Sequence, residues 1–512
     1  MSAGVPHTIV IGAGIGGLTT AALLLQAGHR VTVLEAHTYP GGSAGTFYNR
    51  GYRFDAGATL AGGFAPGGPH ARLAEQLGLN WPIRPADPAW VTHLPECSVT
   101  QWGDSDRWQE ERTRAFPASE PFWRKQEQLA ELAWDISSRY FPWPPERPTD
   151  FLHLAAALRP RTLAAAPYLF RSVASLLPSG ASRDLQVFLD AQLLISAQTV
   201  SSQASALYGS AALDLPRRGV NHVRTGIGAL AQTLVNWIRQ NGGTVHFRQA
   251  VERIVVRGGR AAGVVTKRGL ETACDFVVAN VTPWGLAKLL GEQTPPRLSR
   301  EITGRANTWG AFMLYLGMDS SKLPGGIHGH HQVIVDPSRP LGEGNSVFIS
   351  LSDSTDPTRA PEGMRAATLS THTTVASWWS VAKQDPAAYA ARKEEYTERV
   401  LQAAERAIPG IRSAVRLALP GTPLTFQFYT RRPLGMVGGF PQTSLLRARG
   451  PQTGLSNLWL VGDSVFPGQS TAGTTLGGWR VARAVIDAGK THATIQRVSK
   501  PYTENSAESK DV

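Results

Sequence analysis

The chain has 512 residues, of which 42% are hydrophobic and 18% charged, a composition typical of a folded protein with two or three domains. Its two cysteines, Cys97 and Cys274, form no CxxC pair, so neither a disulfide framework nor a thiolate metal site is expected. The net charge of +12 fits either a basic soluble protein or attraction to an anionic membrane; nucleic-acid binding is not expected, because no basic run interleaves with aromatic residues.

The ends of the chain carry no obvious targeting pattern. Residues 1–11 have no basic flank and only a short apolar run, so we expect no secretory signal. No segment approaches the ~20 apolar residues of a membrane-spanning helix. With so few cysteines, a reducing, cytoplasmic compartment is expected. Residues 491–512 are polar and are predicted to be a disordered tail, because they cannot bury enough apolar surface to offset the cost of ordering.

The N-terminal segment has the pattern of a strand, a glycine-rich turn and a helix. Thr8–Ile11 is a β-branched apolar run that suits a strand buried on both faces. Gly12 permits a sharp turn, and Gly14 lets the backbone approach a pyrophosphate. Gly17 lets the helix of residues 18–26 lie close to the strand, with its free N–H groups toward the phosphates. The pattern predicts a dinucleotide site rather than an ordinary α/β turn.

An acidic residue and a second glycine-rich stretch follow. Arg30–Glu35 is a predicted strand, and the Glu35 carboxylate can accept hydrogen bonds from an adenosine ribose. The paired Gly41 and Gly42, with Ser43 after them, offer a second close backbone approach, suited to the far phosphate and ribityl chain of FAD. A plain surface loop is the alternative for this stretch. Its position directly after the acidic residue favours FAD over NAD.

These residues resemble the carotenoid desaturase and isomerase branch of the FAD-dependent amine oxidase superfamily. The matching motifs are Gly12–Gly17, Glu35, Pro40–Gly45 and Gly51–Gly57. Phytoene desaturases usually carry an arginine after the paired glycines, whereas Ser43 is similar to the carotene isomerases and the carotenoid 3′,4′-desaturases. The resemblance implies an FAD cofactor and an acyclic or monocyclic carotenoid substrate.

Phe151–Leu177 is apolar, interrupted by prolines and edged with arginines. Such a segment suits helices that lie on a membrane surface, and it equally suits helices that cover a protein core. The resemblance favours peripheral membrane contact, since a carotenoid must be taken from lipid.

The middle of the chain alternates helical and extended patterns. A glycine-rich entry leads into a helix near residues 226–242, followed by strands at Thr244–Phe247, Val251–Val256 and Asp275–Asn280. By resemblance, the backbone at Val251 contacts adenine. Further strands are predicted at Trp309–Met318, Ser346–Leu351 and Ala366–His372, and a helix at Ala388–Ile408.

The C-terminal region resembles the second flavin signature of the same family. Leu458–Val461 is a predicted buried strand that ends at Gly462, and Asp463 can accept hydrogen bonds from ribityl hydroxyls. A turn from Gly473 through Gly477 to Gly478 is predicted to begin a helix over residues 479–486, whose N-terminus can face the flavin or a phosphate. A purely structural strand–turn–helix is the alternative.

The positions of these motifs predict an α/β fold with a discontinuous Rossmann-like FAD-binding domain. Its parts are residues 1–75, 216–295 and 435–490. Residues 76–215 and 296–434 are predicted to form an inserted substrate domain with a mixed sheet and helices, the first of them membrane-associated. No oligomeric state is predicted.

The implied reaction removes two hydrogens from a C–C bond next to a polyene, with FAD as hydride acceptor. The match of Leu189–Gln198 and neighbouring segments to the 3′,4′-desaturases favours that bond. The alternatives are a redox-neutral carotenoid cis–trans isomerase, an amine oxidase, and a non-catalytic prenyl-protein-binding relative.

No catalytic acid or base is assigned from the sequence. A metal is not expected. His246, His328, His330 and His331 could suggest one, but a loop with several histidines is more often simply polar surface. Five aromatic residues fit either an apolar substrate tunnel or ordinary core packing: Trp378, Trp379, Phe426, Phe428 and Tyr429.

Overall fold

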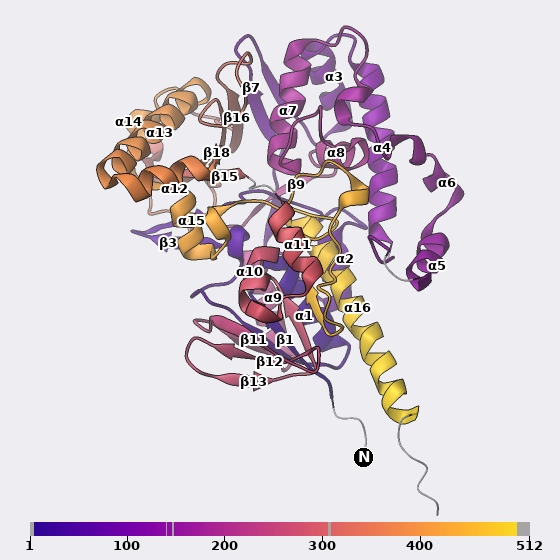
Figure 1. Ribbon diagram of the computed structural model, residues 1–512. Helices are drawn as coiled ribbons and strands as arrows, with labels where there is room; N and C mark the ends of the chain where they lie inside the picture. The colour runs from indigo at the N-terminus through magenta and orange to yellow at the C-terminus, as the bar shows by residue number, and fades with distance from the viewer. Residues whose placement is uncertain (1–4, 140, 146–147, 306–308, 499–512) are drawn as a thin grey trace, which may run out of the picture.

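The computed structural model describes residues 5–139, 141–145, 148–305 and 309–498 (Figure 1). Its centre is a five-stranded parallel sheet in the order β10-β2-β1-β14-β20. The strands are β10 (Thr244–His246), β2 (Arg30–Leu34), β1 (His7–Ile11), β14 (Phe276–Ala279) and β20 (Leu458–Leu460). Strands from both ends of the chain and from its middle therefore form one sheet, which confirms the predicted α/β class and its discontinuous nucleotide-binding part.

Both faces of this sheet are covered, which explains its continuous apolar strands. On one face Val10 and Val278 pack against helices α1 (Ile15–Gln26), α9 (Gly228–Gln240) and α16 (Thr471–Val498). On the other face Ile9 and Val277 contact a small antiparallel sheet and two helices. These elements are β11 (Val251–Arg257), β12 (Arg260–Thr266), β13 (Glu271–Ala273), α10 (Pro283–Leu290) and α11 (Pro296–Gly304).

A seven-stranded mixed sheet forms the second unit, in the order β19-β15-β18-β17-β16-β7-β8. Its strands are β19 (Val415–Gly421), β15 (Trp309–Asp319), β18 (Met364–Thr374), β17 (Ser346–Leu351), β16 (His330–Ile334), β7 (Trp90–His93) and β8 (Ser98–Gln101). The two predicted insertions join here, since β7 pairs in parallel with β16. One face is covered by α12 (Val375–Gln384), α13 (Pro386–Ala407) and α14 (Ile411–Ala414).

A helical cluster borders the far edge of this sheet (Figure 1). Its helices are α3 (Ser105–Ala115), α4 (Glu120–Ser138), α7 (Arg183–Ala197) and α8 (Ala206–Leu213). They enclose an aromatic core that includes Trp108, Trp123 and Phe188. Two short helices, α5 (Pro148–Ala157) and α6 (Pro160–Leu163), lie outside this cluster at the edge of the molecule. Among the helices described, none is long and apolar enough to span a bilayer.

Short elements connect the two units. They are the hairpin β3 (Thr46–Asn49) and β4 (Tyr52–Asp55), the sheet β5 (Ala61–Gly62), β9 (Val220–Val223) and β6 (Ile83–Pro85), and helices α2 (Pro69–Leu77) and α15 (Pro423–Thr430). Tyr52 and Phe54 of the hairpin pack against Met313 and Tyr315 of β15. The first nucleotide-binding segment thus continues directly into a hairpin that packs on the mixed sheet.

The structure corrects two boundaries. The glycines from Gly473 to Gly478 lie within the first turns of α16, which begins at Thr471, so they do not form a turn before a helix. Gly478 must be small because α16 lies against α1 there, not because the chain changes direction. The expected tail began at residue 491, yet α16 continues to Val498; residues 499–512 lie outside the described part of the chain.

Candidate functional site

Four segments meet at the carboxyl edge of the parallel sheet. The amide of Gly12 donates to Leu34, that of Asn280 to Ile11 and that of Val461 to Ala279, all between 2.8 and 3.0 Å. The hydrogen-bonded ladder therefore continues one residue beyond the strands. Because ligands of open α/β sheets bind at this edge, the first glycine turn and the C-terminal signature face the same place.

The glycines of the first turn enclose one side chain, that of Asn280. A Cβ on Gly14 would overlap the Asn280 amide nitrogen, and a Cβ on Gly17 would lie 2.6 Å from the Gly12 carbonyl oxygen and 2.8 Å from the Asn280 Cβ. Gly12 has a φ of +95°, and its Cβ would lie 2.8 Å from the Asn280 carbonyl oxygen. The turn is thus compressed between α1 and the end of β14.

Helix α1 begins at this turn without a side-chain cap. Its N-cap residue is Gly14, which has no side chain to satisfy the first amides of the helix. Uncapped amides and the helix dipole together favour an anionic group such as a pyrophosphate.

Glu35 is fixed beside the turn at the end of β2. One carboxylate oxygen accepts a hydrogen bond from the Ala13 amide and the other from the His37 amide, each at 2.7 Å. Each oxygen retains a lone pair for a ribose hydroxyl. Its backbone also bonds to Gln249, two residues before Val251 in β11, so Val251 lies on the side where adenine is expected.

The paired glycines lie directly on the first turn. The Gly41 amide donates to the Ala13 carbonyl at 2.8 Å, and Gly14 and Gly41 form an isolated parallel bridge. Gly41 and Gly42 both have positive φ, which L side chains rarely adopt. Ser43 is half-buried and accepts the Ala58 amide through its carbonyl, which ties this loop to the segment that follows β4. The alternative of an independent surface loop is therefore excluded.

The C-terminal signature approaches the same edge from β20. Gly462 has a φ of +124°, and its Cβ would lie 3.2 Å from the Asn280 side-chain oxygen. Gly473 is restricted by the Gly468 carbonyl, 2.7 Å from its Cβ position, whereas Gly477 meets only one atom, at 3.9 Å. Among these three positions, 477 is therefore the one at which neighbouring residues leave room for a side chain.

Asp463 forms an ion pair that sequence analysis did not anticipate. Its carboxylate accepts a hydrogen bond from the Arg432 guanidinium at 2.9 Å, and Arg432 also donates to the Met436 carbonyl at 2.8 Å. This pair fixes the glycine stretch near Gly438 against the loop that follows β20, because Arg432 also bonds to the Gly438 carbonyl. The carboxylate retains acceptor capacity for a ribityl hydroxyl.

The model of the flavin containing amine oxidoreductase family matches residues 15–486. The chain belongs to this family. The match includes both insertions as well as the nucleotide-binding segments.

Three kinds of curated relatives of this flavin oxidoreductase align along nearly its whole length. Prolycopene isomerase from Daucus carota is 28% identical, over 94% of this chain and 80% of the relative. Phytoene desaturase (neurosporene-forming) from Rhodobacter capsulatus is 24% identical, over 95% of each chain. All-trans-retinol 13,14-reductase from Danio rerio is 25% identical, over 92% of this chain and 85% of the relative.

Solved structures share the fold at low sequence identity. An oxidoreductase from Methanosarcina mazei has a TM-score of 0.63 at 19% identity, covering 93% of this chain and 100% of that one. Putrescine oxidase bound to putrescine has a TM-score of 0.62 at 16% identity, covering 94% and 99%. At such identities the likeness establishes the architecture of the flavin oxidoreductase.

FAD is the cofactor of this flavin oxidoreductase, and the residues at the sheet edge fit it. The uncapped start of α1 and the compressed turn suit the pyrophosphate, and Glu35 suits the adenosine ribose. The assignment of Gly42, Ser43 and Asp463 to the flavin half of FAD stays a prediction. Asn280 was not assigned from the sequence, although the strand before it was, because only the structure places its side chain between Gly14 and Gly462.

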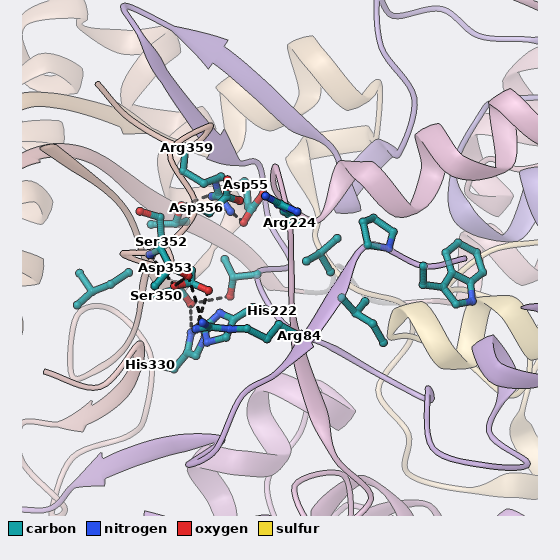
Figure 2. Close-up of a pocket in the computed structure, with 18 residues that line it drawn as sticks. Asp55, Arg84, His222, Arg224, His330, Ser350, Ser352, Asp353, Asp356 and Arg359 are labelled. Atoms are coloured by element: carbon teal, nitrogen blue, oxygen red, sulfur yellow. Dashed lines mark hydrogen bonds and ion pairs between the residues drawn. The ribbon is translucent and has the colours of Figure 1, made fainter. Parts of the chain in front are cut away.

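A polar cavity of about 400 Å³ lies between β6 and β9 on one side and the end of β17 on the other, and Thr59 lines it (Figure 2). Thr59 belongs to the segment of residues 57–59, which contacts the loop of residues 41–43; we call these two segments the flavin loops. Its charged residues are largely paired: Arg84 with Asp353 at 2.6 Å, and Arg359 with Asp55 at 3.0 Å. Asp55 also accepts the Ile227 amide, so the cavity wall is joined to the start of α9.

Two histidines of this cavity stack on each other. His222 of β9 and His330 of β16 have ring centroids 4.7 Å apart. Burial lowers the pKa of both imidazoles, and positive charges nearby lower that of His330 further. Both rings are therefore neutral near pH 7. Among the described residues, no group of three or more His, Cys, Asp or Glu side chains is arranged to hold a metal.

The five aromatic residues suggested for a tunnel do not share one. Trp378 is buried among Phe312 and Tyr396 in the core of the mixed sheet. Phe426 belongs to a different core, on the hairpin side of the sheet. Phe428 is 77% exposed and Tyr429 is 54% exposed, whereas the Trp379 indole donates to the Leu434 carbonyl. Phe426 and Phe428 lie two positions apart in α15 and therefore point to nearly opposite sides of the helix, so these aromatic residues cannot all face inward.

Proposed function

We propose that this protein is an FAD-dependent enzyme of carotenoid biosynthesis that introduces a C–C double bond into a polyene. The observation that carries the proposal is the extent of its alignments with enzymes named for prolycopene, phytoene and retinol. Each covers at least 92% of this chain, and therefore includes the insertions as well as the cofactor segments. All three compounds are isoprenoid polyenes.

Bound FAD supplies the hydride acceptor for such a reaction. The uncapped start of α1 and Glu35 would hold the cofactor at the edge of the parallel sheet. A conjugated polyene delocalises the charge that develops on an adjacent carbon, so no strongly basic side chain at the reacting carbon is required. The protein's task is positioning and exclusion of water.

Within this class we favour desaturation at the 3′,4′ bond of an acyclic or monocyclic carotenoid. Ser43 after the paired glycines and the Leu189–Gln198 segment support this choice. That segment forms most of α7, and its last residue lies against the glycine stretch: a Cβ on Gly438 would lie 2.6 Å from the Gln198 amide carbon. The segment that distinguishes the subgroup thus contacts a loop near the flavin site.

Redox-neutral cis–trans isomerisation is the second candidate. It is favoured by the prolycopene isomerases, which have 28% identity against 24% for the phytoene desaturase. Ser43 is compatible with both reactions.

Anaerobic incubation of the FAD-loaded protein with a carotenoid separates the candidates by product mass. A product lighter by two hydrogen atoms, with stoichiometric bleaching of the flavin, is expected for desaturation. An unchanged mass with a shifted absorption spectrum indicates isomerisation instead. Hydrogen peroxide and ammonia released from amines in air, with no change in any carotenoid, would contradict both and indicate an amine oxidase.

We further propose that the protein lies on the cytoplasmic face of a membrane and takes its substrate from lipid. Helices α5 and α6 and the turn after them expose large apolar side chains: Phe151, Leu152, Leu158, Leu163 and Phe170, with Phe170 83% exposed. We call these five residues the apolar patch. Arg159, Arg161 and Arg171 are exposed among them, which favours an anionic lipid surface.

A further inference from the structure

We propose that His222, His330, Ser350 and Thr59 form a proton path between the polar cavity and the flavin loops. This inference goes beyond the carotenoid reaction, because any reduction or reoxidation of bound FAD exchanges protons with solvent. It rests on an uninterrupted chain of hydrogen bonds between four side chains from four segments (Figure 2).

The distances in this chain are those of hydrogen bonds throughout. His222 Nδ1 lies 3.3 Å from His330 Nε2, and His330 Nδ1 lies 2.9 Å from Ser350 Oγ. Ser350 Oγ donates to Thr59 Oγ1 at 2.6 Å. His330 and Ser350 are only 3% and 5% exposed, so solvent does not compete with these bonds along the middle of the path.

The directions of the hydrogen bonds are mutually consistent. Since Ser350 donates to Thr59, it accepts from His330, which must carry its proton on Nδ1. His330 Nε2 is then an acceptor and receives the Nδ1–H of His222. His222 Nε2 is left as an acceptor, and the Thr59 hydroxyl is left as a donor. A proton taken up at His222 Nε2 can therefore be matched by one released from Thr59, with each bond along the path reversing its direction.

Neutral imidazoles are required for such a transfer, because a neutral ring donates through one nitrogen and accepts through the other. His222 faces Arg84 and Asp353, an ion pair, together with Arg359 and Arg365. The pKa of His330 is lowered first by burial and then by the positive charge of His222, His331, Arg365 and Arg359. Burial and these charges oppose a resident imidazolium at His330, so a proton that enters does not remain there.

The two ends of the path lie where a proton path requires them. His222 is half-buried and lines the cavity, which has room for water. Thr59 follows Gly57 and Ala58, and these two residues lie against the Ser43 carbonyl: the Ala58 amide donates to it at 3.1 Å, and a Cβ on Gly57 would lie 2.7 Å from it. The path thus ends on the segment after β4, which contacts the loop that carries the paired glycines.

The adjacent His331 provides a matched control within the same strand. Neighbouring residues of β16 point to opposite faces of the sheet, and His331 contacts His93 at 3.0 Å and the His328 carbonyl. Burial lowers the pKa of His331 to about 4. His331 thus shares the strand and the burial of His330, but its imidazole pair leads away from Thr59.

The first test reads the tautomers in the FAD-loaded protein by ¹⁵N–¹H correlation spectra of its histidines. Nδ1–H forms are expected for His222 and His330, whereas Nε2–H is the usual form of a free imidazole. An Nε2–H form at His330 would overturn the proposed direction of the chain and the path with it.

The second test follows proton uptake with a pH-indicator dye after flash photoreduction of bound FAD by an added one-electron donor whose oxidation releases no proton. Two electrons and one proton convert FAD to its anionic hydroquinone. His330→Gln should slow the uptake on the order of a hundredfold, as expected for loss of a positioned proton donor, while His331→Gln changes it by less than about twofold. Equal effects of the two variants, or no effect of either, would overturn the proposal.

Smaller substitutions test the path even if the His330→Gln variant fails to fold. Ser350→Ala and Thr59→Val should slow uptake with FAD retained, and Thr59→Ser should restore it. Added imidazole should rescue His222→Ala by entering the cavity, and a lack of rescue in a variant that retains FAD contradicts the path. None of these measurements involves a carotenoid, so their outcome is independent of the proposed substrate.

Discussion

At the scale of single residues, Asn280 explains why three glycines of the first turn, Gly12, Gly14 and Gly17, tolerate no side chain. Its amide group lies between Gly14 and Gly462, its carbonyl oxygen limits Gly12, and its Cβ limits Gly17. The glycine pattern therefore serves two purposes, because it admits a pyrophosphate and it admits a protein side chain from β14. Only the first purpose was visible in the sequence.

The Arg432–Asp463 pair is predicted to stabilise the flavin half of the site. Its side chains are 15% and 20% exposed, so Arg432→Gln and Asp463→Asn should each lower the free energy of unfolding by about 1.5–3 kcal/mol, as for hydrogen bonds to charged groups. A double-mutant cycle measured by chemical denaturation should give a coupling of about 0.5–3 kcal/mol.

The exposed pair Arg412–Glu398 is the control, and Arg412→Gln should lower the free energy of unfolding by about 0–1 kcal/mol. Additive effects in the first pair would show that it does not act as a unit.

His70 is predicted to make the fold sensitive to acid. Burial lowers its pKa to about 3, and its Nε2 has no hydrogen-bond partner among the residues described. The unfolded chain binds a proton on this ring below about pH 6.5, whereas the native chain does not until about pH 3, so stability is lost as the pH falls through that window. His70 alone should therefore contribute a loss of about 2 kcal/mol between pH 6.5 and pH 5.

The check is the free energy of unfolding between pH 7.5 and pH 5. His70→Gln should reduce the slope of this profile, and the same change at the exposed His153 of α5 should leave the slope unchanged. An identical slope in the wild type and the His70 variant would refute the assignment.

At the scale of elements, the site depends on how closely α1 and α16 approach. A Cβ on Gly478 would lie 2.8 Å from the Gly16 carbonyl oxygen and 2.8 Å from the Thr19 Cβ, and Thr20 donates to the Gly478 carbonyl. Helices from opposite ends of the chain are thus in backbone contact beside the pyrophosphate position (Figure 1). The glycines of the C-terminal signature are in part a helix-packing motif.

Two glycine-to-alanine changes in α16 are predicted to have opposite effects. Gly478→Ala should lower the free energy of unfolding by about 1–3 kcal/mol, because α1 must move to admit the methyl group. Gly489→Ala lies in the same helix, where the nearest atom is on Phe276 at 3.8 Å, and should raise stability by about 0.5–1 kcal/mol. Thermal denaturation with bound FAD provides the comparison. Stabilisation by both changes would contradict the close contact.

At the scale of the whole molecule, two separate insertions build one substrate unit. β7 and β8 come from the first insertion, and they extend a sheet whose other five strands come from the second. The flavin-binding part is joined to the mixed sheet by packing, since the hairpin of β3 and β4 lies on β15. The apolar patch lies apart from both, at the outer edge of the helical cluster.

The apolar patch is predicted to attach the protein to anionic vesicles. Leu152→Glu should lower binding to phosphatidylglycerol-containing vesicles by about tenfold or more, because a large apolar side chain contributes about 1.5 kcal/mol or more when buried. Leu270, 49% exposed at the β12–β13 turn, is the control, and Leu270→Glu should have little effect. Binding should also weaken with salt. Co-sedimentation measures both, and equal binding of the two variants would argue against the patch.

Local pattern in the sequence determined the nucleotide half of this protein. The strand, glycine turn, helix and acid of residues 8–35 form one contiguous unit, whose spacing alone predicts where Glu35 lies relative to Gly14. The same holds for the strand at Leu458, because a short apolar run that ends at a glycine specifies a buried strand.

Tertiary structure alone decided the contacts between distant segments. Asn280 between two glycine turns, Arg432 on Asp463, and the chain from His222 to Thr59 each join residues that no local pattern relates. A polar side chain in a sequence does not reveal its partner, since the partner is set by which strands lie side by side and in which register. The start of α16 at Thr471 was likewise decided by its packing on α1, which turns a stretch rich in glycine into helix.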